Sequence, residues 1–189
     1  MCGSYCAPAR GEGLFETVWE MSESGATGAQ QVSFEFDGME EVPREGFIVR
    51  PTDFAPVLTA HGYERMRFGF RVGYSSSPLF NARSESVHIK KTFAAHYAER
   101  RCLVPAAYYI EKGRRFYMAG GEMMFLAGIY REVAQGQREY VILTRDSSDA
   151  QEVRRIHHRM PVIMPTHMHR SWLEEGLGID DAVSEVVIR

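Results

Sequence analysis

The second residue of the chain, Cys2, carries two groups that together can trap an aldehyde. Methionine aminopeptidase removes an initiator methionine that precedes a small residue, so we expect Cys2 to become the mature N-terminus. A free α-amine has a pKa of about 7.7–8.0, which leaves a useful nucleophilic fraction near neutral pH. The amine can form a Schiff base, and the thiol of the same residue can close onto that imine as a five-membered thiazolidine. The alternative is a cysteine that follows Met1 by chance.

Two further side chains are candidates for moving protons in such a reaction. Glu111 ends an apolar stretch, residues 102–111, beside a turn, where partial burial would suit its carboxyl group to proton transfer. The alternative is an exposed Glu111 that pairs with Lys112 or Arg114. His157 stands where a predicted helix gives way to a strand, a junction that can expose an imidazole able to give or take a proton.

Residues 81–86 read Asn-Ala-Arg-Ser-Glu-Ser and offer groups that could hold a substrate. The Asn81 amide both donates and accepts hydrogen bonds, and the Arg83 guanidinium can hold a phosphate through two hydrogen bonds. The alternative is a turn followed by a helix cap.

Four histidines near the C-terminus raise the question of a metal site. They are His157, His158, His167 and His169. Their spacing matches no standard zinc finger, and residues two apart on a helix diverge. We therefore expect no metal, while a metal protein or a non-catalytic binding module remains an open alternative.

Length and composition bound the class of protein. The 189 residues are 44% hydrophobic and 25% charged, which indicates a single globular domain over 1–189 and excludes collagen, a coiled coil and a wholly disordered chain. No apolar run approaches the roughly 20 residues that span a bilayer, so we expect no membrane association. Three cysteines without a CxxC pair and the lack of a secretory signal favour the cytoplasm.

The formal net charge of −3 gives no global attraction to nucleic acid, although basic residues cluster locally. The clusters are Lys90-Lys91, Arg100-Arg101, Arg114-Arg115, and Arg154-Arg155 with Arg159. A basic face is one interpretation, and scattered solvated charges are the other.

The pattern of apolar residues predicts more strands than helices. Strands are expected over 47–49, 56–59, 65–72, 102–111, 116–118, 123–130, 140–144 and 161–164, with a hairpin turn at 112–115. Helices are expected over 92–100, from a Ser148-x-x-Gln151 capping box to Ile156, and from Thr166 to near Gly176. Residues 22–31 are small and polar, as in a flexible loop. The chain is therefore predicted to be an α+β domain around a curled, mostly antiparallel, barrel-like sheet.

Four blocks of the sequence, in this order, resemble the SRAP (SOS response-associated peptidase) family, whose members sense abasic sites in single-stranded DNA. The blocks are Met1-Cys2-Gly3, Asn81-Ala82-Arg83, residues 101–111 (RCLVPAAYYIE) and residues 156–164 (IHHRMPVIM). The resemblance implies a single α+β domain that forms a thiazolidine crosslink with the ring-opened abasic sugar. It also implies a monomer with no cofactor, in the cytoplasm or on the nucleoid of a bacterium.

The resemblance assigns a role to each matching residue. Cys2 would be the nucleophile, Asn81 would orient the N-terminus, Glu111 would act as acid and base, and His157 would give the proton that opens the deoxyribose. The implied DNA contacts are Gly3, Phe68, Arg83, Thr144 and Arg159, of which Arg83 and Arg159 would hold phosphates and Phe68 would stack on a base. The same catalytic set leaves a second reaction open, that of an autoproteolytic peptidase with an N-terminal nucleophile.

Three positions depart from the family pattern. Ser4 stands where an arginine is usual, Lys112 where the family has a tryptophan after the glutamate, and Phe68 in place of another tryptophan. We therefore expect the contacts with DNA to differ more than the crosslinking chemistry.

Overall fold

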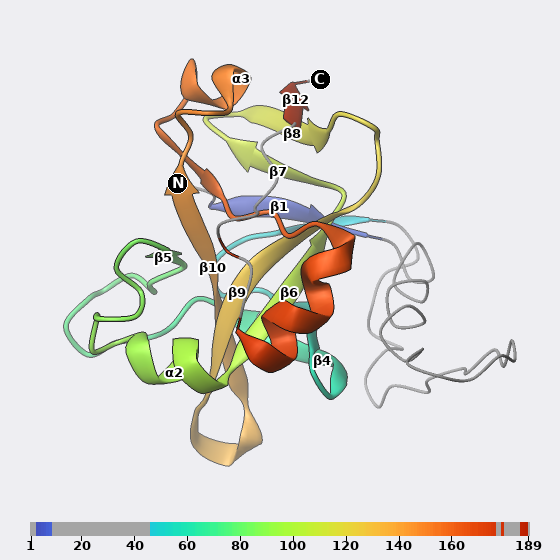
Figure 1. The fold of residues 1–189 in the computed structure, drawn as a ribbon. Coiled ribbons are helices and arrows are strands. Elements are labelled where there is room, and N and C mark those ends of the chain that lie inside the picture. Colours follow the sequence, from blue (N-terminus) through green and yellow to red (C-terminus); the bar gives the residue numbers. More distant parts are fainter. Residues whose placement is uncertain (1–2, 9–45, 177–178, 180–185, 189) are drawn as a thin grey trace, which may run out of the picture.

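The computed structural model describes residues 3–8, 46–176, 179 and 186–188. Cys2 and the predicted loop at 22–31 lie outside the described residues. Two sheets and several short helices make up the rest, and the sheets share a hydrophobic core (Figure 1).

Five strands close into a barrel because β10 pairs with β4 on one side and with β9 on the other. In order around the barrel they are β10 (Arg138–Asp146), β4 (Gly62–Phe68), β3 (Phe54–Thr59), β6 (Arg101–Ala106) and β9 (Met124–Glu132). Neighbours are antiparallel except for the parallel pair β10 and β4. The predicted α+β class with a curled, mostly antiparallel sheet is confirmed.

The second sheet is wholly antiparallel and contains the first strand of the chain. Its order is β12 (Val186–Ile188), β8 (Arg114–Met118), β7 (Tyr108–Glu111), β1 (Ser4–Ala7) and β2 (Phe47–Val49). The chain passes from the barrel into this sheet at Ala107, whose N–H donates to the Cys6 carbonyl at 2.8 Å. The strand expected over 102–111 is therefore two strands, one in each sheet.

Two short strands, β5 (Asn81–Arg83) and β11 (Arg159–Pro161), pair with β10 outside the barrel. Both meet β10 at the same residue, because Thr144 lies opposite Arg83 on one side and Pro161 on the other. The turn or helix cap considered for residues 81–86 is thus a strand at its start.

The helices are shorter than expected. They are α2 (Ala94–Glu99), α3 (Gln151–Arg154), the 3-10 turns η2 (Ala134–Gly136) and η3 (Thr166–Met168), and the π-helical turn η4 (Ser171–Glu175). The capping box at Ser148 is wrong, because α3 follows Ala150 and the Ser148 N–H donates to Asp146 instead. Thr166 is not a cap either, since it already lies within η3. Gly176 ends η4 at φ 77°, as predicted for a glycine C-cap.

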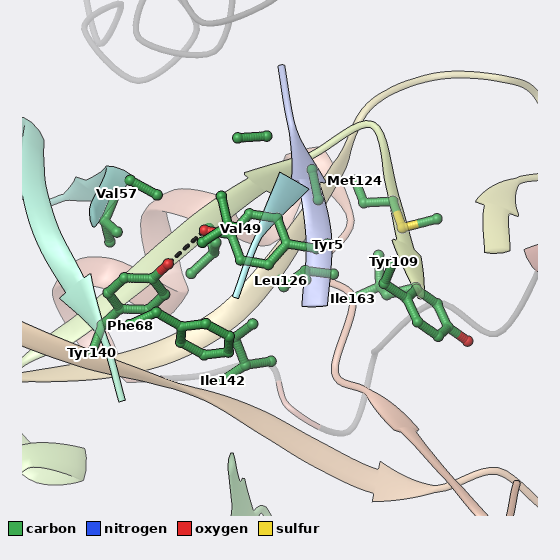
Figure 2. Packing of buried hydrophobic residues seen from close by; sticks show 14 of the residues in the cluster. Tyr5, Val49, Val57, Phe68, Tyr109, Met124, Leu126, Tyr140, Ile142 and Ile163 are labelled. Atoms are coloured by element: carbon green, nitrogen blue, oxygen red, sulfur yellow. Dashed lines mark hydrogen bonds between the residues drawn. The ribbon is translucent and has the colours of Figure 1, made fainter. Parts of the chain in front are cut away.

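A single hydrophobic cluster joins the barrel to the second sheet. At its centre the hydroxyls of Tyr5 on β1 and Tyr140 on β10 are 2.5 Å apart, and both side chains are fully buried (Figure 2). The Tyr140 ring stacks on Phe68, with centroids 5.1 Å apart. Alternation along β1 directs Tyr5 and Ala7 into this cluster, so β1 is anchored from its inner face.

His169, one of the histidines considered as a metal ligand, is instead part of the core between η3 and η4. It is 1% exposed, its Nε2 lies 3.2 Å from the Met164 carbonyl, and its ring centroid is 4.5 Å from that of Phe125. Burial lowers its pKa from 6.5 to about 4. The folded protein thus holds the ring neutral at a pH where an exposed imidazole would be charged.

We expect Tyr5→Phe to destabilise the protein by about 1–3 kcal/mol, because it leaves the Tyr140 hydroxyl buried without its partner. Tyr140→Phe should cost a similar amount. The double variant should cost less than the sum of the two, since no unpaired hydroxyl remains. Urea unfolding of the three variants measures this coupling, and strictly additive losses would contradict the role given to the hydrogen bond.

The buried His169 also predicts a pH dependence of stability. Between pH 6.5 and about 4 the unfolded ring binds a proton that the folded ring does not, so the free energy of unfolding falls as pH falls. The loss should total about 2–4 kcal/mol, with a slope of at most about 1.4 kcal/mol per pH unit. In His169→Gln this part of the slope should disappear, whereas the exposed neighbour His167→Gln should keep it. Parallel stability curves for wild type and His169→Gln would refute the assignment.

Candidate functional site

The register of β1 against β7 sets the start of the described chain beside a buried carboxylate. Ser4 lies opposite Ile110 and Tyr5 opposite Tyr109, so the next pair outward is Gly3 and Glu111. Glu111 is 7% exposed and shares the inner face of β7 with Tyr109. The partial burial expected for Glu111 is confirmed, and the alternative of an exposed strand-end glutamate is wrong.

A tight turn fixes what lies on the other side of Glu111. Lys112 and Gly113 both have positive φ, 47° and 75°, as in the two-residue type I′ turn of a β-hairpin. This turn pairs Glu111 directly with Arg114 on β8. Glu111 therefore lies between Gly3 on one neighbouring strand and Arg114 on the other.

Asn81 presents a buried acceptor at the first residue of β5. Its Nδ2 donates to the Phe80 carbonyl at 3.0 Å and reaches the Ile142 carbonyl at 3.5 Å. Its Oδ1 is buried and accepts no hydrogen bond from any described residue. A buried amide oxygen without a donor is costly, so this atom suits an N–H group brought by another part of the chain or by a ligand.

His157 is held through both its main chain and its ring. Its carbonyl accepts from the Ser147 hydroxyl at 2.8 Å, and its Nδ1 lies 3.0 Å from the Arg159 N–H. The same nitrogen lies 3.1 Å from the Arg159 carbonyl, so the backbone of Arg159 fixes the orientation of the ring in either tautomer. The ring also stacks on that of His158, with centroids 4.5 Å apart.

Arg159 is turned into the protein and already has a counter-charge. Its side chain is 9% exposed, and its two terminal nitrogens donate to the two carboxylate oxygens of Glu85 at 2.5 and 2.8 Å. It also donates to the carbonyl of Thr144. The hydrogen bonds from Arg159 lower the pKa of Glu85 below 4.5. This geometry does not support a phosphate contact for Arg159, because Glu85 neutralises its charge.

Sequence reasoning missed Glu85 as a site residue. The signal was its place in the Asn-Ala-Arg-Ser-Glu segment, but nothing in the sequence pairs it with a residue 74 positions away. The ion pair ties the segment that follows β5 to β11, on the other side of β10, and so links the segments that carry Asn81 and His157.

Two of the predicted DNA contacts, Phe68 and Thr144, are buried, whereas Arg83 is exposed. The Phe68 ring is fully buried against Tyr140, so the prediction that it stacks on a base is wrong. Thr144 is 1% exposed, and its hydroxyl contacts the Ala82 carbonyl, so a direct DNA contact is wrong for it too. Arg83, one residue further along β5, is exposed.

The predicted residues thus form two groups. One follows the chain start, with Gly3 paired to Glu111; the other gathers at the carboxyl end of β10, with Asn81, Arg83 and His157 on the segments that join it. Both groups border the same hydrophobic cluster. The partly buried Phe80 and Ile156 pack against this cluster, and core residues of β7 and β8 are members of it.

The helix α3 adds a second link between these groups. It contacts both β11 and β12, and its Glu152 accepts from the Ile188 N–H of β12 at 3.3 Å. In Figure 1, α3 lies close to β8 and β12 at the top of the molecule. The nucleophile expected to work with both groups, Cys2, lies outside the described residues.

The part of the chain that the structure describes holds no group of three or more His, Cys, Asp or Glu side chains arranged for a metal ion. Nor does it contain a helix long and apolar enough to cross a membrane.

Solved structures share this fold. A protein from Bordetella bronchiseptica superposes with a TM-score of 0.68 and 21% identity, covering 99% of this chain and 98% of the other. A phage-related protein from the same organism gives 0.68 at 18% identity, covering 100% and 93%, and a protein from Bacteroides thetaiotaomicron gives 0.60 at 19%, covering 75% and 76%.

Named relatives match a shorter stretch. The abasic site processing proteins YoqW and YobE of Bacillus subtilis are 25% and 28% identical over 114 and 116 residues, which is 54% of this chain in both cases. The match spans about half the length of those relatives, 50% and 51%. The SOS response associated peptidase (SRAP) family matches over residues 1–188, nearly the whole chain, and the protein therefore belongs to the SRAP family.

Proposed function

We propose that this protein forms a covalent crosslink with abasic sites in single-stranded DNA through the N-terminal Cys2 left by removal of Met1. The observation that carries the proposal is the strand register that sets Gly3 opposite the buried Glu111. Consecutive Cα atoms are about 3.8 Å apart, so Cys2 is bound within one peptide unit of that pair. The names of the Bacillus relatives, abasic site processing proteins, supply the substrate.

The proposed reaction joins two new bonds to one carbon. The α-amine of Cys2 attacks C1′ of the open-chain abasic sugar, and the resulting carbinolamine loses one water to give an imine. The thiol then adds to the imine carbon, forming the C–S bond while its proton passes to the nitrogen. The product is a thiazolidine, and the net reaction releases one water. The second step is intramolecular, which favours ring closure strongly.

Each described residue of the site has a task in this scheme. Glu111 takes a proton from the attacking amine and returns it to the leaving hydroxyl, as a carboxylate beside the chain start can do. The buried Oδ1 of Asn81 accepts a hydrogen bond from the N-terminal amine and orients it. His157 donates a ring proton to the ring oxygen of the closed deoxyribose, which opens the sugar to the aldehyde.

The crosslink itself is the first test. Protein lacking Met1 is incubated with a single-stranded oligonucleotide carrying one abasic site, and the products are separated on a denaturing gel. We expect a shifted, heat-stable band with wild type and none with Cys2→Ala. Cys2→Ser should give a band only when borohydride is added, because it retains the amine but lacks the thiol that closes the ring. An undiminished, stable band with Cys2→Ala would overturn the proposal.

Two further variants separate the chemistry from the fold. Glu111→Gln should slow crosslinking on the order of 100-fold at saturating DNA, the range of general acid–base catalysis. His157→Gln should slow it with the closed-ring sugar but less with an acyclic aldehyde, which needs no ring opening.

Peptide hydrolysis that depends on Cys2, without any DNA adduct, would instead favour the alternative of an N-terminal-nucleophile peptidase.

The exposed Arg83 gives a prediction on affinity. If its guanidinium neutralises one phosphate, Arg83→Gln should reduce the dependence of log K on log salt by about 0.7–1 unit. The affinity is measured over a series of salt concentrations on Cys2→Ala protein, so that no crosslink interferes. An unchanged slope would remove Arg83 from the DNA contacts.

A further inference from the structure

The β7–β8 hairpin places Arg114, a second exposed arginine besides Arg83, at the proposed site. Arg114 is the cross-strand partner of Glu111, and side chains directly opposite each other on one face have Cβ atoms about 4.5–5.5 Å apart. Arg114 therefore lies on the same face of the sheet as Glu111. Gly3, Glu111 and Arg114 follow one another across three neighbouring strands.

The charge of Arg114 is not used within the described part of the protein. Four arginines of β4, β9, β10 and β11 are paired with carboxylates: Arg67 and Arg131 with Glu139, Arg138 with Glu64, and Arg159 with Glu85. Arg114 is exposed and takes part in no ion pair or side-chain hydrogen bond with another described residue. An exposed guanidinium that no described carboxylate neutralises, next to a buried carboxylate, is suited to an anion supplied by a ligand.

The next residue on the same strand provides an internal comparison. Arg115 is also exposed, but it pairs with Ile110 and so lies on the opposite face of the hairpin. Its guanidinium lies over the Tyr108 ring, 5.2 Å from the centroid. Two exposed arginines on one strand thus occupy opposite faces of the same sheet.

We propose that Arg114 binds the DNA phosphate next to the abasic sugar that Cys2 attacks. This inference rests on the proposed function. An abasic nucleotide has one phosphate on its 5′ side and another on its 3′ side. When its sugar carbon lies beside Gly3, one of these phosphates can reach Arg114 on the far side of Glu111. Arg83, at the end of β5, then remains for a phosphate on the β10 side of the site. Arg114 contributes binding and orientation, whereas Glu111 moves the proton.

The test measures binding without chemistry. The probe is a single-stranded oligonucleotide with one tetrahydrofuran abasic analogue, which has no aldehyde and cannot crosslink. We expect Arg114→Gln to raise Kd about tenfold and to lower the salt slope by about 0.7, as expected for one lost phosphate contact. The matched variant Arg115→Gln should keep Kd within about twofold and leave the salt slope unchanged. Arg114→Lys should keep the salt slope but bind more weakly, because it retains the charge and loses the two-pronged hydrogen bond.

A change in the probe identifies the phosphate itself. A neutral methylphosphonate is placed on the 5′ or the 3′ side of the analogue. One of these two probes should bind wild type about tenfold more weakly, and Arg114→Gln should bind that probe no more weakly than the unmodified one. Equal losses for Arg114→Gln and Arg115→Gln, or undiminished sensitivity to the methylphosphonate in Arg114→Gln, would overturn the inference. Thermal melting of each variant separates a lost contact from a lost fold.

The two proposals fail in different ways. If wild type forms no adduct with a true abasic aldehyde while the Arg114 pattern holds with the analogue, crosslinking is refuted and the phosphate contact stands. If the adduct forms and the Arg114 pattern is absent, only the phosphate contact is refuted.

Discussion

The hydrogen bond between Tyr5 and Tyr140 decides where the chain begins relative to everything else. Both rings are fully buried, so the Tyr140 hydroxyl would lose the hydrogen bond that satisfies it if Tyr5 moved away. A shift of β1 by one residue would turn Tyr5 to the outer face of its sheet and put Cys6 in its place. The bond therefore selects the register in which Gly3, and not Ser4, lies opposite Glu111. An N-terminal nucleophile needs this kind of constraint, because chain ends are otherwise the least ordered part of a fold.

Pairing with the end of β10 likewise fixes the positions of the remaining site residues. β5 and β11 are three residues long, too short to be stable alone, and each is held by β10 and by the ion pair between Glu85 and Arg159. Hydrogen bonds to the Glu85 carboxylate and to Thr144 offset the cost of burying Arg159. The charge of Arg159 therefore stabilises the contact between these segments. Arginines at this site thus divide into one that is neutralised inside the protein and others, such as Arg83, that are exposed to a ligand.

The sequence predicts the strands well where alternation is strong, and it predicts the hairpin because residues 112–115 contain Gly113. The turn itself is shorter than predicted, since only Lys112 and Gly113 have positive φ and β8 already begins at Arg114. It does not separate inner from outer faces in a closed barrel, where strands such as β3 are buried along most of their length. The resemblance to the family implied DNA contacts at Phe68 and Thr144, and the strand pattern does not reveal that both side chains are buried. The interruption at Ala107 was also hidden, since an apolar run looks the same whether it stays in one sheet or crosses to another. Glu111 could be singled out because a lone carboxylate in an apolar strand needs a reason to be there.

The hairpin turn has a consequence that residue type alone would not give. With two residues in the turn, Arg114 falls on the face of Glu111 and Arg115 on the face of Ser4 and Ile110. One added residue would exchange the two faces, because strand side chains alternate. Arg115 lies in the row of Ser4, but its guanidinium lies over Tyr108, so it does not supply the arginine that the resemblance leads us to expect at Ser4. The cation that this chain offers beside Glu111 comes from a different strand, and the length of a two-residue turn is what puts it there.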